Sequence, residues 1–208
     1  FAMSLGTGMS LGANVTIATN IGSGRMDAVR RAVHTAMLAA IGGGIILGLT
    51  GELVIGPIMA AMGIKDPEVE AMALLYMRIY LAGLPILFLY DFEAAIMRSQ
   101  GDTRTPLIAL TISGMVNIGL NLLFVLGLGM DVDGVASATV ISSAVSSAVL
   151  LWCLTHSDSV IRVNLRELAI DWPSLKRILI VGLPAGIQGA LFSVSNVIVQ
   201  AAVNSLDN

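Results

Sequence analysis

The sequence predicts an all-α membrane protein, a polytopic bundle of about six transmembrane helices. Of its 208 residues, 56% are hydrophobic and 12% are charged, and the mean hydropathy is +0.87. Soluble domains carry about 25% charged residues, and half of that charge cannot cover the surface of a water-soluble protein. Backbone groups in lipid must find their hydrogen-bond partners within the crossing segment, so the apolar segments are expected to be helices.

Composition also excludes several classes of function. The net charge is −3 without a dense basic run, so we expect no nucleic-acid partner. The single cysteine, Cys153, excludes an internal disulfide, and two histidines are too few for a histidine-based metal centre. The chain has no Ser-His-Asp set, and its three-glycine run at 42–44 lies in an apolar segment, where a phosphate-binding loop cannot form. We therefore expect no enzyme activity and no cofactor.

Six apolar segments are long enough to span a bilayer, which takes about 20 residues. The first, 1–21, has no charge, and the second, 35–62, is interrupted only by Glu52. The third, 71–97, is apolar but carries Arg78, Asp91 and Glu93.

The remaining three segments are free of charge. Residues 105–130 and 134–157 are joined by the short Asp131-Val132-Asp133, and the last segment covers 178–206. The chain begins at Phe1 inside an apolar stretch and shows no signal peptide. We therefore expect a piece of a longer polytopic protein.

Basic residues orient these spans. Nine of the eleven Lys and Arg residues lie in the first, third and fifth connections, whereas the second and fourth are mainly acidic. The positive-inside rule places the odd connections, 22–34, 98–104 and 157–177, in the cytoplasm. The nine are Arg25, Arg30, Arg31, Arg98, Arg104, Arg162, Arg166, Lys176 and Arg177.

The fifth connection is the longest and most polar, and is the best candidate for a boundary between two lobes. It ends in Asp171-Trp172-Pro173-Ser174, which predicts a helix start with an interfacial tryptophan. Glycine pairs spaced by four predict close helix packing. These pairs are Gly8/Gly12, Gly44/Gly48 and Gly182/Gly186.

An acidic residue inside a span needs a polar partner, water, or a position from which its side chain reaches the membrane surface. A carboxylate at the centre of a membrane-spanning helix otherwise costs about 3 kcal/mol on insertion scales. Asp91 lies six residues before Met97, about 9 Å along the axis, too deep for a short side chain to reach the interface. Its alternative interpretation is an ion pair with Arg98 on the same face. Glu93 is nearer the cytoplasmic end, and we expect it to be interfacial. Glu52 precedes Gly56-Pro57, near the outer surface.

Uncharged polar residues form a second set. Asn117 and Asn121 are one turn apart, and hairpin geometry places Asn117 within a turn of Asp91 and Asn121 within a turn of Thr139. An oxygen-rich cluster of this kind suits Na⁺ or a titrating carboxylate. Hydrogen bonding that only holds helices together, at about 0.6 kcal/mol per pair, explains the pattern equally well.

The last span carries a polar stripe, which we expect to face protein or a water-filled cavity because facing lipid would be costly. It comprises Gln188, Asn196, Gln200 and Asn204.

Several motifs in order along the chain resemble the multidrug and toxic compound extrusion (MATE) family. In the first lobe these are Tyr80-Leu81-Ala82-Gly83-Leu84-Pro85, Arg98-Ser99-Gln100-Gly101-Asp102-Thr103-Arg104-Thr105-Pro106, Asn117-Ile118 and Gly134-Val135-Ala136-Ser137-Ala138-Thr139. Gly182-Leu183-Pro184-Ala185-Gly186-Ile187-Gln188-Gly189, followed by Phe192-Ser193-Val194-Ser195-Asn196, resembles the opening helix of the second lobe.

The resemblance implies a twelve-helix, two-lobe transporter of the plasma membrane that exports drugs or other small organic, often cationic, compounds. Export would be driven by H⁺ or Na⁺ through a cavity that opens to each side in turn. The chain would supply five helices of the N-terminal lobe (1–156), a cytoplasmic linker (157–173) and the first helix of the C-terminal lobe (174–208). Its partners would be the substrate, the bilayer and the remainder of the same transporter, and alone it should not transport.

The resemblance also implies a cation site in the first lobe. Similar proteins use an Asp on the first helix, an Asn and an Asp on the fifth, and a hydroxyl on the sixth. The matching residues are Asn117, Asn121 and Thr139, with Asp91 at a family Asn position on the fourth helix. Because Asn121 stands where many relatives have Asp, we hypothesise that Asp91 supplies the charge. Candidates for the substrate cavity are Gln188, Asn196 and Glu52.

Two alternatives stay open. A lipid-linked saccharide flippase of the same superfamily would be expected to line its cavity with Arg or Lys, whereas only Arg78 lies within a span. A non-transporting membrane scaffold predicts no ion-dependent flux.

Overall fold

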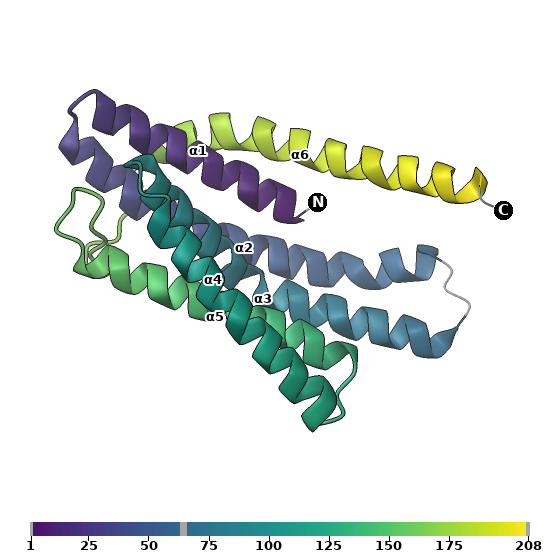
Figure 1. Ribbon diagram of the computed structural model, residues 1–208. Coiled ribbons are helices and arrows are strands. Elements are labelled where there is room, and N and C mark those ends of the chain that lie inside the picture. Colours follow the sequence, from purple (N-terminus) through teal and green to yellow (C-terminus); the bar gives the residue numbers. More distant parts are fainter. Residues whose placement is uncertain (1, 63–65, 207–208) are drawn as a thin grey trace.

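The protein is a bundle of long helices (Figure 1). The structure is a computed structural model that describes residues 2–62 and 66–206, without the side chains at 61, 62, 197, 198 and 200–206. Those ranges contain no strand, which confirms the all-α prediction. The elements are α1 (Ala2–Gly22), α2 (Met26–Met62), α3 (Pro67–Ser99), α4 (Arg104–Asn121), the π-helix η1 (Leu122–Gly127), α5 (Val132–His156) and α6 (Trp172–Leu206).

Within the described residues, five helical segments are long and apolar enough to cross a membrane: α2, α3, α4 with η1, α5 and α6. The sixth expected span, α1, has 21 residues without charge. It is rich in Gly, Ser, Thr and Asn, and several of these residues are buried against neighbouring helices. Several helices run beyond the expected spans, and α2 begins at Met26 rather than at residue 35. Charged first turns can stay helical outside the hydrocarbon layer, where water solvates them.

The helix α3 is central. It packs against α1, α2 and α5, whereas α4 packs mainly on α5 (Figure 1). Phe88 and Phe92 of α3 are fully buried beside Ile17 of α1 and Met37 of α2. By contrast, α4 exposes most of its apolar side chains, including Leu107 at 61%. Such a surface belongs in lipid or against further protein.

Glycine pairs bring helix backbones into contact, as their spacing predicted. A Cβ at Gly8 would collide with the backbone of Gly186, and one at Gly182 would lie 2.7 Å from the Met9 Cα. Figure 1 shows the resulting seam, in which α1 and α6 lie side by side. Gly44 of α2 packs in the same manner against Pro85 of α3. The small residues of these pairs are therefore required by the packing.

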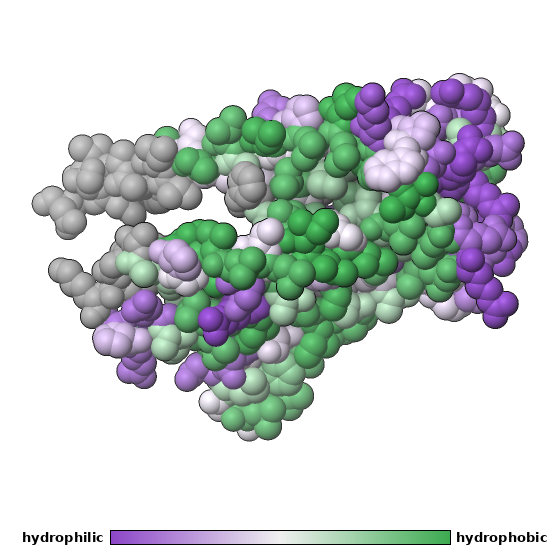
Figure 2. Space-filling model, turned by 180° about the vertical axis from the view of Figure 1, so that it is seen from behind, coloured by the Kyte–Doolittle hydropathy of each residue, from purple (hydrophilic) through white to green (hydrophobic). Residues whose placement is uncertain are grey.

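The three odd connections lie at one end of the bundle. Arg30 at the start of α2 forms an ion pair with Glu167 of the long connection. Ser159 of that connection donates a 2.7 Å hydrogen bond to Gln100 of the α3–α4 turn. Figure 2 shows the largest group of hydrophilic residues at one end, a smaller group toward the other end, and a mostly apolar surface between them. This arrangement agrees with the alternation that the charge pattern predicted.

The Gly-Asp-Thr-Arg-Thr-Pro segment forms the tight α3–α4 turn. Gly101 has φ of +90°, a conformation that side chains disfavour. The Asp102 carboxylate then accepts hydrogen bonds from the backbone N–H groups of Arg104 and Thr105, both at 3.0 Å, and from the Thr105 hydroxyl at 2.6 Å. The Thr105 hydroxyl holds the pKa of Asp102 below its usual value, and the two N–H groups act in the same direction. Asp102 thus anchors the first turn of α4.

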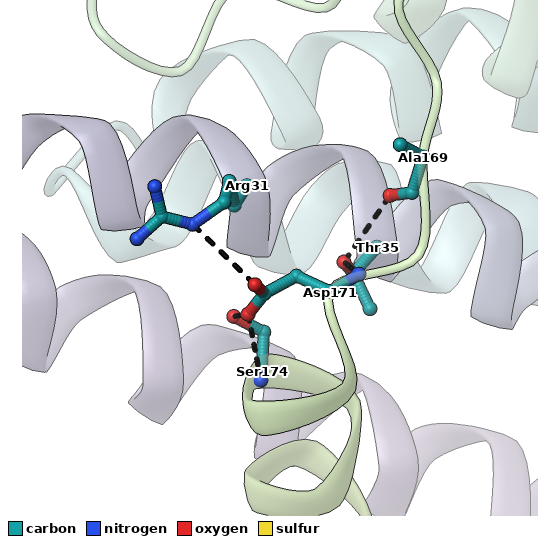
Figure 3. A network of polar contacts seen from close by, with 5 residues as sticks. All are labelled: Arg31, Thr35, Ala169, Asp171 and Ser174. Atoms are coloured by element: carbon teal, nitrogen blue, oxygen red, sulfur yellow. Dashed lines mark hydrogen bonds and ion pairs between the residues drawn. The ribbon is translucent and has the colours of Figure 1, made fainter.

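Asp171 starts α6, as predicted (Figure 3). Its carboxylate accepts hydrogen bonds from Ser174, 3.0 Å from the backbone nitrogen and 2.6 Å from the hydroxyl. Its own N–H donates to the Thr35 hydroxyl of α2 at 2.9 Å, and its carboxylate lies 3.4 Å from Nε of Arg31. One residue therefore caps α6 and ties the long connection to α2.

Candidate functional site

An amide track runs between α4 and α5. We use this name for Asn121, Asn117 and Ser142. Nδ2 of Asn121 donates to Oδ1 of Asn117 at 3.0 Å, and Nδ2 of Asn117 donates to the Ser142 hydroxyl at 3.3 Å. Oδ1 of Asn121 is buried and has no hydrogen-bond partner in the described residues. The track therefore presents one unsatisfied amide oxygen.

The backbone changes from an α-helix to a π-helix directly after Asn121. Asn121 is the last residue of α4, and the π-helix η1 begins at Leu122. Such π-helical turns are rare and frequently occur at functional sites. The π-helix ends at Gly127, and Gly129, which has φ of +66°, lies in the short connection before α5 begins.

Thr139 lies on α5 near the track but turns its hydroxyl inward along its own helix. The hydroxyl donates to the Val135 carbonyl at 3.0 Å, and the Ser142 hydroxyl donates to the Thr139 carbonyl, also at 3.0 Å. Thr139 thus contacts the track through its backbone. Ser142, which the sequence argument did not single out, is the residue that joins α5 to Asn117. Its place in a run of small residues, 136–148, gave no signal that separated it from its neighbours.

Asp91 lies on a different interface. Its carboxylate accepts a 3.5 Å hydrogen bond from the Thr7 hydroxyl of α1. Among the described residues, no hydrogen bond joins it to Asn117, Asn121 or Thr139, and no ion pair joins it to Arg98. The structure therefore brings the two amides together and places the carboxylate on the α1 side of α3.

Glu93 was wrongly expected at the interface. Its side chain is 0% exposed, and neither carboxyl oxygen has a hydrogen-bond partner in the described part of the chain. The Ser147 side chain of α5 lies beside it. Two residues along a helix turn the side chain by about 200°, so Glu93 faces α5 whereas Asp91 faces α1. The small residues of α5 allow it to pack closely over Glu93. The prediction rested on the distance of Glu93 from the helix end, which gives no information about this packing.

A cavity of about 690 Å³ opens between α1, α3 and α6. Thr7, the hydrogen-bond partner of Asp91, lines it together with Asn14 and Arg98. Asn14 also donates to the Ala95 carbonyl at 3.0 Å, which links α1 to α3. The cavity wall on α6 includes Gly189. Asp91 thus lies next to a space that is bounded by helices from both ends of the chain.

The other cavity candidates lie apart. Glu52 of α2 forms a 2.9 Å ion pair with Arg78 of α3, and both line a cavity of about 470 Å³. Gln188 and Asn196 of α6 are exposed and have no hydrogen-bond partner in the described residues. The side chains of Gln200 and Asn204 lie outside the described residues. The described part of the stripe, Gln188 and Asn196, therefore faces the surroundings of this chain.

Comparison with known proteins decides the family. A family model described as MatE matches residues 1–123, more than half of the chain. The chain belongs to the MATE family. MATE proteins are multi-pass membrane transporters and not enzymes.

Several MATE relatives are similar over most of the chain. A probable multidrug resistance protein NorM of Thermotoga maritima is 32% identical over 190 residues, covering 88% of this chain and 40% of its own length. A FAD transporter of Shewanella oneidensis is 23% identical and covers 99% of this chain and 46% of its own length. A MATE crystal structure in the straight conformation has a TM-score of 0.88 at 26% identity, covering 98% of this chain and 45% of its own. The chain spans less than half of each relative.

Proposed function

We propose that the full-length protein exports drugs or other small organic, often cationic, compounds as an antiporter driven by H⁺ or Na⁺. Membership of the MATE family and similarity to a probable multidrug resistance protein support the substrate class. The carrying observation is the buried, unpartnered Oδ1 of Asn121 at the start of a π-helix. An amide oxygen left without a donor is a suitable ligand for a cation.

In this proposal, the coupling residues lie in two places: Asn117, Asn121 and Thr139 between α4 and α5, and Asp91 on the α1 side of α3. The amide track supplies neutral oxygens, and Asp91 supplies the charge beside the cavity between α1, α3 and α6. Residues 1–156 belong to one lobe, 157–173 form the linker, and 174–208 begin the second lobe. We expect the substrate to contact Gln188, Asn196 and Glu52 in turn during alternating access.

The test is drug accumulation in cells that express the intact protein, with and without a proton uncoupler or a Na⁺ gradient. A cationic dye and FAD serve as the two substrate types, since one relative is named a FAD transporter. We expect dye efflux that collapses when one of the two gradients is removed. An efflux rate that is unchanged when either gradient is removed would refute the antiporter mechanism. The absence of any efflux would favour a non-transporting scaffold.

A further inference from the structure

A second polar cavity lies at the end where the odd connections meet, away from the amide track. Its volume is about 1010 Å³, and it forms where the connection after α5 folds back over the ends of α5 and α2. Three arginines line it: Arg30, Arg162 and Arg166. Transport as proposed above uses none of them.

Two of these arginines are available to a ligand. Arg30 is paired with Glu167, whereas Arg162 and Arg166 form no ion pair within the described residues. Nε of Arg162 donates to the Thr155 carbonyl at the end of α5, at 3.1 Å, which fixes the side chain and leaves its terminal nitrogens free. Guanidinium groups bind phosphate through paired hydrogen bonds. The cavity therefore suits a phosphate group.

The same cavity is also apolar on one side. Val160 and Leu165 line it and are 43% and 54% exposed. One turn earlier on α5, Trp152 is 64% exposed, and its ring packs at a tilt against that of His156 with 5.1 Å between centroids. Tryptophan is enriched at the membrane interface. A free phosphate ion gains nothing from contact with apolar side chains. A phospholipid can contact the arginines through its phosphate and the apolar side chains through its acyl chains.

We propose that this cavity binds the headgroup phosphate of an anionic phospholipid from the cytoplasmic leaflet. Arg162 and Arg166 hold the phosphate, and Val160 and Leu165 contact the first part of the acyl chains. Basic pockets on the cytoplasmic side of membrane proteins take such lipids. The lipid would tie the connection between α5 and α6 to the bilayer.

The experiment uses the purified full-length transporter in neutral detergent. Its melting temperature is followed while phosphatidylglycerol, phosphatidylcholine or inorganic phosphate is added. We expect phosphatidylglycerol to raise the melting temperature most. The apparent affinity should fall about fivefold for each arginine removed in the double variant Arg162→Gln/Arg166→Gln.

The matched control is Arg25→Gln/Arg104→Gln, which removes two exposed arginines at the same end but outside the cavity. Equal weakening in both double variants would overturn the proposal, because it would show diffuse attraction to a basic surface. An equal response to inorganic phosphate would overturn it as well. Arg166→Gln alone leaves the Arg162–Thr155 hydrogen bond intact and serves if the double variant does not fold. Binding is read without transport, so its failure is distinct from failure of the proposed function.

Discussion

Asn121 donates a 3.0 Å hydrogen bond to Asn117 one turn earlier, and this bond turns its own Oδ1 into a buried position without a donor. Leaving a buried acceptor unsatisfied costs about 1–3 kcal/mol. A ligand that fills this position would recover that free energy. The bond between the two amides therefore fixes the orientation of Asn121 and leaves its Oδ1 available to a ligand.

Exchanging the charge between Asp91 and Asn121 tests whether the two act in one coupling site. In the full-length protein, we expect Asp91→Asn with Asn121→Asp to retain gradient-driven dye efflux, because the number of carboxylates is unchanged. Each single exchange changes that number by one and should reduce efflux. Transport assays in cells that express each variant at equal levels provide the measurement. Complete loss in the double variant, with both single variants active, would count against a shared site.

Adding one methyl group at Gly8 tests the α1–α6 seam. Gly8→Ala places a Cβ against the backbone of Gly186, so we expect it to destabilise the protein by about 1–3 kcal/mol. The control is Gly114→Ala, where a Cβ meets nothing within 4 Å. That variant should be neutral or gain up to about 1 kcal/mol from helix propensity. Thermal melting should give a lower melting temperature for Gly8→Ala than for Gly114→Ala, and equal melting temperatures would contradict the packing.

Glu93 tests how a buried carboxyl is tolerated between α3 and α5. A carboxyl without a partner fits an apolar interface only in its neutral form, so Glu93→Gln should fold with nearly unchanged stability. Glu93→Lys buries a charged group and should abolish folding, seen as loss of monodisperse protein on size-exclusion chromatography. Glu68→Lys, at an exposed position in the first turn of α3, is the control and should fold. A well-folded Glu93→Lys protein would show that the side chain can reach water.

The Asp171 cap should weaken in acid. The Ser174 hydroxyl donates to the Asp171 carboxylate and lowers its pKa below the usual 3.8, with further help from the Ser174 N–H and Arg31. A carboxylate with a lowered folded pKa stabilises the protein above its unfolded pKa, and that stabilisation is lost as the pH falls through the folded value. Asp171→Ala should therefore cost about 1 kcal/mol at neutral pH and little at low pH.

Hydrogen exchange at the start of α6 measures this effect, with Asp158→Ala as the control. Asp158 is an exposed acid of the same connection and caps no helix. A penalty for Asp171→Ala that stays unchanged as the pH falls through the lowered pKa of Asp171 would show that the cap does not depend on the charge.

Patterns that depend on one helix alone could be predicted from the sequence. The spans follow from apolar length, the presence of close-packing faces from glycine spacing, and the start of α6 from Asp171 before Trp172-Pro173. The common end of the odd connections follows from their charges, because basic residues share one side of the membrane.

Features that depend on which face of a helix meets which neighbour could not be predicted. Asp91 and Glu93 are two residues apart, yet one reaches Thr7 and the other is covered by α5. Hairpin geometry estimates how deep a residue lies along the helix axis, but it does not say which face of the helix carries the side chain. It could therefore not show that Asp91 and Asn117 lie on different interfaces. Similarly, Ser142 became recognisable only when its hydroxyl was seen to meet Asn117.

The ties among the odd connections hold one end of the bundle together. Arg30 pairs with Glu167, Gln100 with Ser159, and Thr35 with Asp171, so three connections are joined at the cytoplasmic end. A displacement of the connection between α5 and α6 would therefore be passed directly to α2 and to the α3–α4 turn.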